Sequence, residues 1–275
     1  MMAASFNHKT LQKSGLMSSQ QMAQLLVSDI DFVYPNGHVV FRNFSLHARS
    51  GEFVVLLGPS GCGKSTLLNL LSGFYQPTGG SVTVNGTPIT PESPELGYVF
   101  QSSHLFPWLS ALENVRFGLR MAKRMSTEEQ RERARHYLAL VGLEKAAEKL
   151  PHQLSGGMQQ RVALARTLVM EPTLLLMDEP FAALDAISRT SMNDETLRIW
   201  SALGQTVVFI THDIDEAVFL ADRVVVLGTA PSGIQSELHI ELPRPRHQHE
   251  TRKLPLFRDY CNALMDRVAA AMQAA

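Results

Sequence analysis

Short runs of consecutive apolar residues alternate with amphipathic stretches along most of the chain. Four of these runs predict buried strands: EFVVLLG, TLLLMDEP, TVVFITHD and RVVVLG. The stretches between them carry apolar residues at helical spacing. Continuous apolar strands that alternate with helices are typical of a mainly parallel sheet covered on both faces. The pattern therefore predicts an α/β fold.

The same pattern divides the chain into segments. Residues 1–24 are polar and predict a flexible N-terminal tail. Residues 25–242 contain the strands and form the main domain, in which residues from about 102 to 168 are mostly helical. In that helical insert, Ser126 and Glu129 match a capping box for a helix that runs through Leu140.

Residues 243–275 predict a linker and a C-terminal helix. The stretch PRPRHQHETRK is polar and contains two prolines, which is typical of a linker. The spacing of apolar residues then predicts one helix over Phe257–Met272.

Composition narrows the class of protein. The chain has 275 residues, of which 45% are hydrophobic and 19% charged, as in an ordinary globular protein. A net charge of -1 gives no basic footprint for nucleic acid, so we expect no nucleic-acid partner. The two cysteines suit a reducing compartment. No apolar run is long enough for a membrane helix and none resembles a signal peptide, so we expect a cytoplasmic protein that meets a membrane only through a partner.

The stretch GPSGCGKST follows the first apolar strand and opens a helix, which is the context of a phosphate-binding loop. Its glycines let backbone N–H groups surround phosphate oxygens. Lys64 would place its charge on the β- and γ-phosphates, and Ser65 would offer a hydroxyl to Mg²⁺. The expected nucleotide contacts are Gly58, Pro59, Ser60, Gly61, Cys62, Gly63, Lys64, Ser65 and Thr66.

Polar residues follow three other predicted strands. Asp178 closes one of them and is a candidate Mg²⁺ ligand, and Glu179 beside it could polarise an attacking water. Gln101 could reach Mg²⁺ or water, and His212 could donate to the γ-phosphate. A single Gln or His at a strand end is most often only a polar cap, so these two gain weight as members of the set.

A second candidate anion site lies in LSGGMQQR, where Ser155, Gly156 and Gly157 start an amphipathic stretch. A serine and two glycines at a helix N-terminus expose backbone N–H groups and a hydroxyl to an anion. This loop contains no lysine, unlike the first.

Together these motifs resemble the nucleotide-binding subunit of ABC transporters, over residues from about 25 to 230. The matching pieces, in order, are GPSGCGKST, the Q-loop residue Gln101, the signature LSGGM, LLLMDEP, the D-loop ALD that ends at Asp185, and the switch residue His212. The resemblance implies a P-loop NTPase (RecA-like) core, an antiparallel β subdomain and a helical insert subdomain. It also implies ATP and Mg²⁺ as cofactors, with Tyr34 stacked on adenine.

The resemblance gives the second loop a role. Two copies would form a head-to-tail homodimer in which the Ser155–Gly157 loop of each covers ATP held by Lys64 of the other. Lys64, Gln101, Glu179 and His212 would carry hydrolysis, and Asp185 would connect the two sites. Met158 departs from the family, which most often has glutamine there, and leaves the contact of that position open.

Further stretches are similar to the nitrate, sulfonate and taurine importer group. This similarity implies a permease dimer in the membrane, a solute-binding protein as an indirect partner, and a small anionic solute. It places the chain at the cytoplasmic face of the inner membrane. Phe106, Pro107 and Trp108 stand where the family docks its permease, although Phe106 and Trp108 fit the core of the helical insert equally well.

Three other classes are less consistent with the sequence. A soluble ABC ATPase without a membrane partner would carry a second cassette, a coiled coil or a zinc insert. A P-loop kinase or GTPase would lack the LSGGM loop, and the GTPase would need a guanine motif. A subunit with a degenerate site would not keep Lys64, Asp178, Glu179 and His212.

Overall fold

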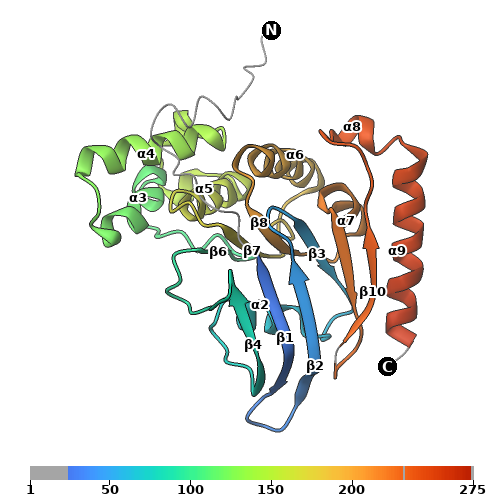
Figure 1. Ribbon diagram of the computed structural model, residues 1–275. Coiled ribbons are helices and arrows are strands. Elements are labelled where there is room, and N and C mark those ends of the chain that lie inside the picture. Colours follow the sequence, from blue (N-terminus) through green and yellow to red (C-terminus); the bar gives the residue numbers. More distant parts are fainter. Residues whose placement is uncertain (1–23, 232, 274–275) are drawn as a thin grey trace.

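The computed structural model describes residues 24–231 and 233–273. The predicted tail at residues 1–24 lies outside this range except for Gln24. Two sheets with helices around them make up the described chain (Figure 1).

The larger sheet is mainly parallel, as the sequence predicted. Its strands are β3 (Phe53–Leu57), β6 (Leu96–Val99), β7 (Leu174–Asp178), β8 (Thr206–Ile210), β9 (Arg223–Leu227) and β10 (Ile234–His239). They lie in the order β10-β9-β3-β8-β7-β6, and only the edge strand β10 runs antiparallel to its neighbour. The carboxyl ends of β3, β6, β7 and β8 therefore meet at one edge, where ligands bind in open parallel sheets.

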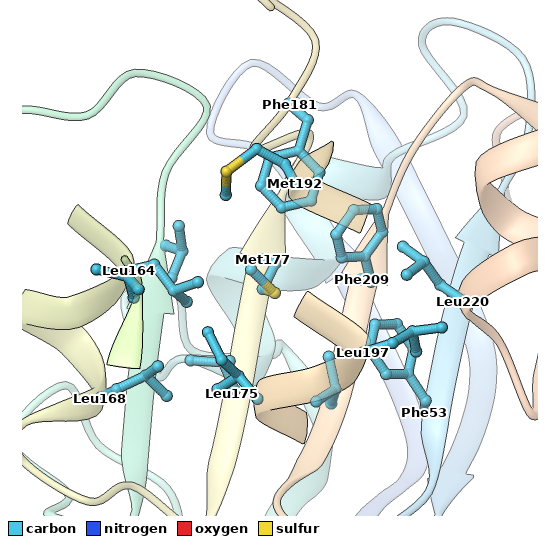
Figure 2. Packing of buried hydrophobic residues seen from close by; sticks show 14 of the residues in the cluster. Phe53, Leu164, Leu168, Leu175, Met177, Phe181, Met192, Leu197, Phe209 and Leu220 are labelled. Atoms are coloured by element: carbon cyan, nitrogen blue, oxygen red, sulfur yellow. The ribbon is translucent and has the colours of Figure 1, made fainter. Parts of the chain in front are cut away.

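Helices cover both faces of this sheet, and alternate side chains of β3 pack against the helices on each face. Phe53 and Val55 join a core with residues from α5 (Gly156–Leu168), α6 (Ala186–Leu203) and α7 (Ile214–Leu220). Figure 2 shows this face, where Met177 of β7 and Phe209 of β8 are surrounded by helical side chains. Val54, on the other face, joins the core formed with α2 (Lys64–Leu71).

The smaller sheet is antiparallel and holds α2 in place. It contains β1 (Leu25–Val33), β2 (Val39–Ala48), β4 (Gly79–Val84) and β5 (Thr87–Pro88), in the order β2-β1-β4-β5. Its apolar side chains and those of α2 share one core with the large sheet. This is the antiparallel subdomain that the resemblance implied, and it fixes the start of α2.

A helical subdomain interrupts the large sheet between β6 and β7. It contains α3 (Ala111–Ala122), α4 (Thr127–Leu140), α5, and two short 3₁₀ turns at Glu144–Ala146 and Pro151–Gln153. The predicted capping box is confirmed: the Ser126 hydroxyl accepts from the Glu129 N–H, and the Glu129 carboxylate accepts from the Ser126 N–H at 2.7 Å.

The segment expected to be a linker is anchored to the domain. Arg246 is only 4% exposed and donates to backbone carbonyls at the end of α7 and after β10. Arg244 pairs with Asp222 at 2.7 Å and stacks over the Trp200 ring. A short helix α8 (Gln248–Thr251) and the long helix α9 (Pro255–Gln273) follow, and α9 packs against α7. Within residues 24–231 and 233–273, no helix has the length and apolarity needed to cross a membrane.

Candidate nucleotide-binding site

The phosphate loop joins β3 to α2. Gly58, Gly61 and Gly63 all have positive φ angles, which only glycine adopts readily. A Cβ at Gly63 would also lie 2.6 Å from Val40 of the small sheet, so this glycine is required by packing as well. No side chain among the described residues caps the start of α2, so its first N–H groups are available to an anion.

Lys64 and Cys62 lie close together in this loop, with the Lys64 Nζ 3.8 Å from the Cys62 Sγ. The Lys64 ammonium donates to the carbonyls of Gly58 at 2.8 Å and Pro59 at 2.9 Å. The Cys62 side chain is buried, and burial raises the pKa of its thiol, although the nearby Lys64 charge opposes the shift. Cys62 can therefore contribute its backbone to a phosphate site, while its sulfur packs in the core.

Ser65 and Asp178 bring two oxygen donors together at the end of β7. Their side chains share a hydrogen bond. Burial, together with the charge of Glu179, raises the pKa of Asp178, whereas the Ser65 hydrogen bond and the Lys64 charge oppose that shift. The carboxylate thus lies in a partly desolvated place where a cation would stabilise its charge.

Glu179 follows β7 in a left-handed conformation, with φ 41°. A non-glycine residue in this region carries strain, which is often found at functional sites. The Glu179 N–H donates to the carbonyl of Ile210 at 3.1 Å, which joins the end of β7 to the end of β8. The Glu179 carboxylate then lies beside His212, two residues beyond β8.

Gln101 lies at the same edge of the sheet, two residues beyond β6 and exposed. Tyr34 follows β1 and lies beside the first turn of α2, where its hydroxyl is 2.9 Å from that of Thr66. The Tyr34 ring packs edge-on against Phe32 and Tyr75. Tyr75 is a member of this aromatic group that the sequence did not predict, because nothing in its local pattern distinguishes it.

The Ser155–Gly157 loop lies at the start of α5, beside the start of α6. Ser155 caps α5 by accepting from the Met158 N–H, and Asp185 caps α6 by accepting from the Ser188 N–H at 3.0 Å. The nearest neighbours of a Cβ at Gly156 or Gly157 belong to Leu184 and Ser188. Met158 is partly buried against the core. The loop therefore lies beside the D-loop of its own chain.

Sequence analysis also did not identify the residues behind His212. Arg189 reaches from α6 to Asp213, and Glu216 is buried in α7 beside Thr211. The only local signal is a carboxylate three residues after Asp213, which matches the acidic first turn of a helix.

These features define a P-loop nucleotide-binding domain: a strand leads into a glycine loop that opens a helix, and polar side chains lie at the ends of the neighbouring strands. Comparison with known proteins then specifies the family. The family model "ABC transporter" matches residues 41–182. The chain belongs to this family and is an ABC-type ATPase.

Curated relatives and a solved structure support the same family assignment. The nitrate import ATP-binding protein NrtD of Synechococcus elongatus is 48% identical over 229 residues, which are 82% of this chain and 84% of the relative. The bicarbonate transport ATP-binding protein CmpD of Synechocystis sp. is 44% identical and covers 89% of this chain and 88% of its own length. The dimeric cassette MJ0796 bound to ADP and Pi is 35% identical with a TM-score of 0.70, and covers 79% of this chain and 99% of its own. The resemblance to importer ATP-binding subunits is confirmed.

Proposed function

We propose that two copies of this chain hydrolyse ATP at shared sites and thereby drive an importer for a small anion. In each site, one chain supplies the phosphate loop and Glu179, and the other supplies Ser155–Gly157. The dimeric solved relative supports the pairing. The proposal rests on the free space around Gly156 and Gly157.

Within the part of the chain that the structure describes, nothing requires glycine at these two positions. Neither has a positive φ, and a Cβ at either would meet no atom closer than 3.8 Å. By contrast, a Cβ at Gly63 would clash with Val40. Close approach of another molecule explains glycines that the chain's own packing does not require. Because these two glycines lie at the N-terminus of α5, where an anion binds favourably, the γ-phosphate held by a partner chain is a suitable molecule.

The residues at the end of the sheet have complementary roles in this proposal. Lys64 and the first N–H groups of α2 bind the β- and γ-phosphates, and Tyr34 stacks on adenine. Glu179 orients the attacking water, and His212 donates to the γ-phosphate as negative charge develops. The Ser155 hydroxyl and backbone N–H groups of the other chain add anion contacts without adding net charge. Asp185, beside the Ser155–Gly157 loop, connects the two sites.

The donor set at Asp178 also fits Mg²⁺. The described part of the chain contains no group of three or more His, Cys, Asp or Glu side chains that could hold a metal by themselves. Mg²⁺ commonly takes one or two protein oxygens together with substrate phosphates, and the Ser65 hydroxyl and Asp178 carboxylate provide such oxygens. Gln101 follows the neighbouring strand β6. When bound, Mg²⁺ neutralises charge on the phosphates.

A permease in the inner membrane is the proposed second partner, and it would hold the chain at the cytoplasmic face. Trp108 is 72% exposed in the helical subdomain, whereas Phe106 is partly buried against Phe117. The sequence left open whether these aromatic residues dock to a permease or pack in the core of the helical subdomain. The exposure of Trp108 favours docking, and the burial of Phe106 favours packing. The nitrate and bicarbonate relatives support a small oxyanion as solute, delivered by a solute-binding protein. They favour an importer over a soluble ATPase without a membrane partner.

The first experiment measures mass by light scattering for Glu179→Gln, with and without ATP and Mg²⁺. The expected result is a monomer that becomes a dimer with ATP, because this variant binds but does not hydrolyse. Adding Ser155→Arg should abolish the dimer. Ser126→Arg is the matched control, since Ser126 is an exposed helix N-cap outside the site. Dimers that persist with Ser155→Arg would contradict the shared site.

The second experiment tests the solute and the membrane partner. The chain is reconstituted in vesicles with the permease and solute-binding protein encoded beside it, and uptake of nitrate, taurine and bicarbonate is measured. Nitrate uptake is the expected result. Trp108→Ala should uncouple ATP hydrolysis from uptake, while Met121→Ala, another exposed apolar residue of this subdomain, should not. Equal uptake by both variants would contradict docking through Trp108.

A further inference from the structure

Arg189 joins two loops that lie far apart in the sequence. Its Nη2 donates to the carbonyl of Leu184 at 3.0 Å and to that of Ala182 at 3.5 Å. Its Nη1 lies 3.4 Å from the Oδ2 of Asp213. Leu184 immediately precedes Asp185, and Asp213 immediately follows His212. One guanidinium therefore connects the D-loop to the loop that carries His212.

Asp213 in turn determines the backbone around His212. Its N–H donates to the Thr211 hydroxyl at 3.0 Å, and its Oδ1 accepts from the N–H of Glu216 at 3.0 Å, which caps α7. The Thr211 hydroxyl also donates to the buried Glu216 carboxylate. Both neighbours of His212 are thus held by the same network.

The His212 ring depends on this network because the ring itself is largely exposed. Its side chain is 61% exposed, and its contact at Glu179 is 3.2 Å long. An exposed ring at the end of a strand takes its position from the backbone on either side. A shift of Asp213 would therefore move the ring relative to Glu179.

Arginine suits this connection better than lysine. The guanidinium is planar and presents several N–H donors in a fixed fork, so it can bind a carboxylate and two carbonyls at once. A lysine ammonium is a compact charge on a flexible chain. The Arg189–Asp213 pair is partly exposed, with side chains 28% and 31% accessible, and such pairs add little stability. A geometric role explains the arrangement better than stability does.

We propose that Arg189 is a positioning residue that transmits the state of the D-loop to His212. This proposal rests on the proposed function, in which residues 182–185 lie near the partner chain. The bonds of Arg189 to Leu184 and Asp213 are present in the single chain. In the proposal, contact of the partner with the D-loop fixes Leu184, and these bonds then hold Asp213 and the His212 ring in place for hydrolysis. Without Arg189, ATP still binds and the dimer still forms, but His212 is misplaced.

The test compares Arg189→Ala and Arg189→Lys with Arg198→Ala, an arginine of the same helix that pairs with Glu195. Steady-state ATP hydrolysis gives kcat and KM, and thermal unfolding verifies that each variant is folded. The expected result for both Arg189 variants is a kcat lower by about tenfold, because misplacement of one catalytic group has effects of at least this size. KM should change less than about twofold, as expected when ground-state binding is kept. Arg198→Ala should leave both constants unchanged.

Two further measurements separate positioning from other roles. In the Glu179→Gln background, Arg189→Ala should keep the ATP-driven dimer. Combined with Asp213→Asn, Arg189→Ala should add no further loss of kcat, because both variants break the same connection. A folded Arg189→Ala protein with kcat within about twofold of the original would overturn the proposal, and so would full rescue by Arg189→Lys or loss of the dimer. Failure of Glu179→Gln itself to dimerise would instead count against the shared site.

Discussion

The Nδ1 of His212 lies 3.2 Å from the Oε2 of Glu179, although the two residues are 33 positions apart in the sequence. Strands β7 and β8 are parallel neighbours, and each residue follows the carboxyl end of its strand. The sheet therefore brings together the two side chains to which we assign the hydrolytic step. Their contact makes Glu179 and His212 interdependent, which leads to the first prediction.

Glu179→Gln should lower kcat by about a hundredfold or more while ATP binding is kept, because an amide cannot act as a general base. His212→Ala should also lower kcat. The double variant should lose less than the product of the two single effects, since the residues contact each other. Single-turnover hydrolysis and nucleotide binding by fluorescence measure both steps. Multiplicative losses would show that the two side chains act independently.

Glu216 should make stability depend on pH. Burial raises the pKa of this carboxyl from 4.5 to about 7. Below pH 4.5 the group is protonated in both states. As pH rises toward 7, the unfolded chain ionises first and the folded state loses stability, by about 1.4 kcal/mol per pKa unit.

The measurement compares urea unfolding of the original chain and Glu216→Gln at pH 5 and pH 8. The Gln variant should gain stability relative to the original as pH rises. Asp215→Asn, on the same helix but half exposed, is the control. If the unfolding free energies of Glu216→Gln and the original chain depended on pH in the same way, the raised pKa of Glu216 would be contradicted.

Cys62 should react slowly with thiol reagents. The side chain is 1% exposed and its pKa is raised by burial, so few reactive thiolates are accessible in the folded state. ATP should slow the reaction further. Once a bulky group is attached, ATP binding should be lost, because the loop and Lys64 leave no room for it. Mass spectrometry in a Cys261→Ser background follows the reaction, and full ATP binding after complete modification would contradict the prediction.

Comparison of alanine variants at Gly63 and Gly37 distinguishes backbone strain from steric clash. Gly63→Ala should destabilise the protein more than Gly37→Ala, because only Gly63 has a neighbour, Val40, at 2.6 Å from the added Cβ. Both have positive φ angles, 97° and 85°, so the backbone strain of about 1–2 kcal/mol is shared. Gly63→Ala should also lose ATP binding. Chemical unfolding and nucleotide titration test both statements, and equal losses would contradict the clash.

The parts of the fold that sequence predicted are those with a local signature. The apolar runs gave β3, β7, β8 and β9, and the spacing of Ser126 and Glu129 gave the start of α4. The phosphate loop was equally clear, because its glycines and Lys64 lie within nine consecutive residues.

The rest depends on contacts between distant segments. Arg246 lies in a polar stretch with two prolines, and only the folded chain shows that it is buried against the end of α7. Arg189 and Glu216 look like ordinary helical residues until the fold places them behind His212. Register in the small sheet, where Leu25 pairs with both Ala48 and Val84, is likewise determined by long-range packing.

The left-handed backbone of Glu179 has a consequence for how the sequence can evolve. At φ 41°, glycine or asparagine would be accommodated with less strain than glutamate. Folding alone would therefore favour replacement at this position, and only selection for hydrolysis would keep the carboxylate. Copies released from that selection should lose Glu179 early and remain folded, as nucleotide-binding proteins without turnover.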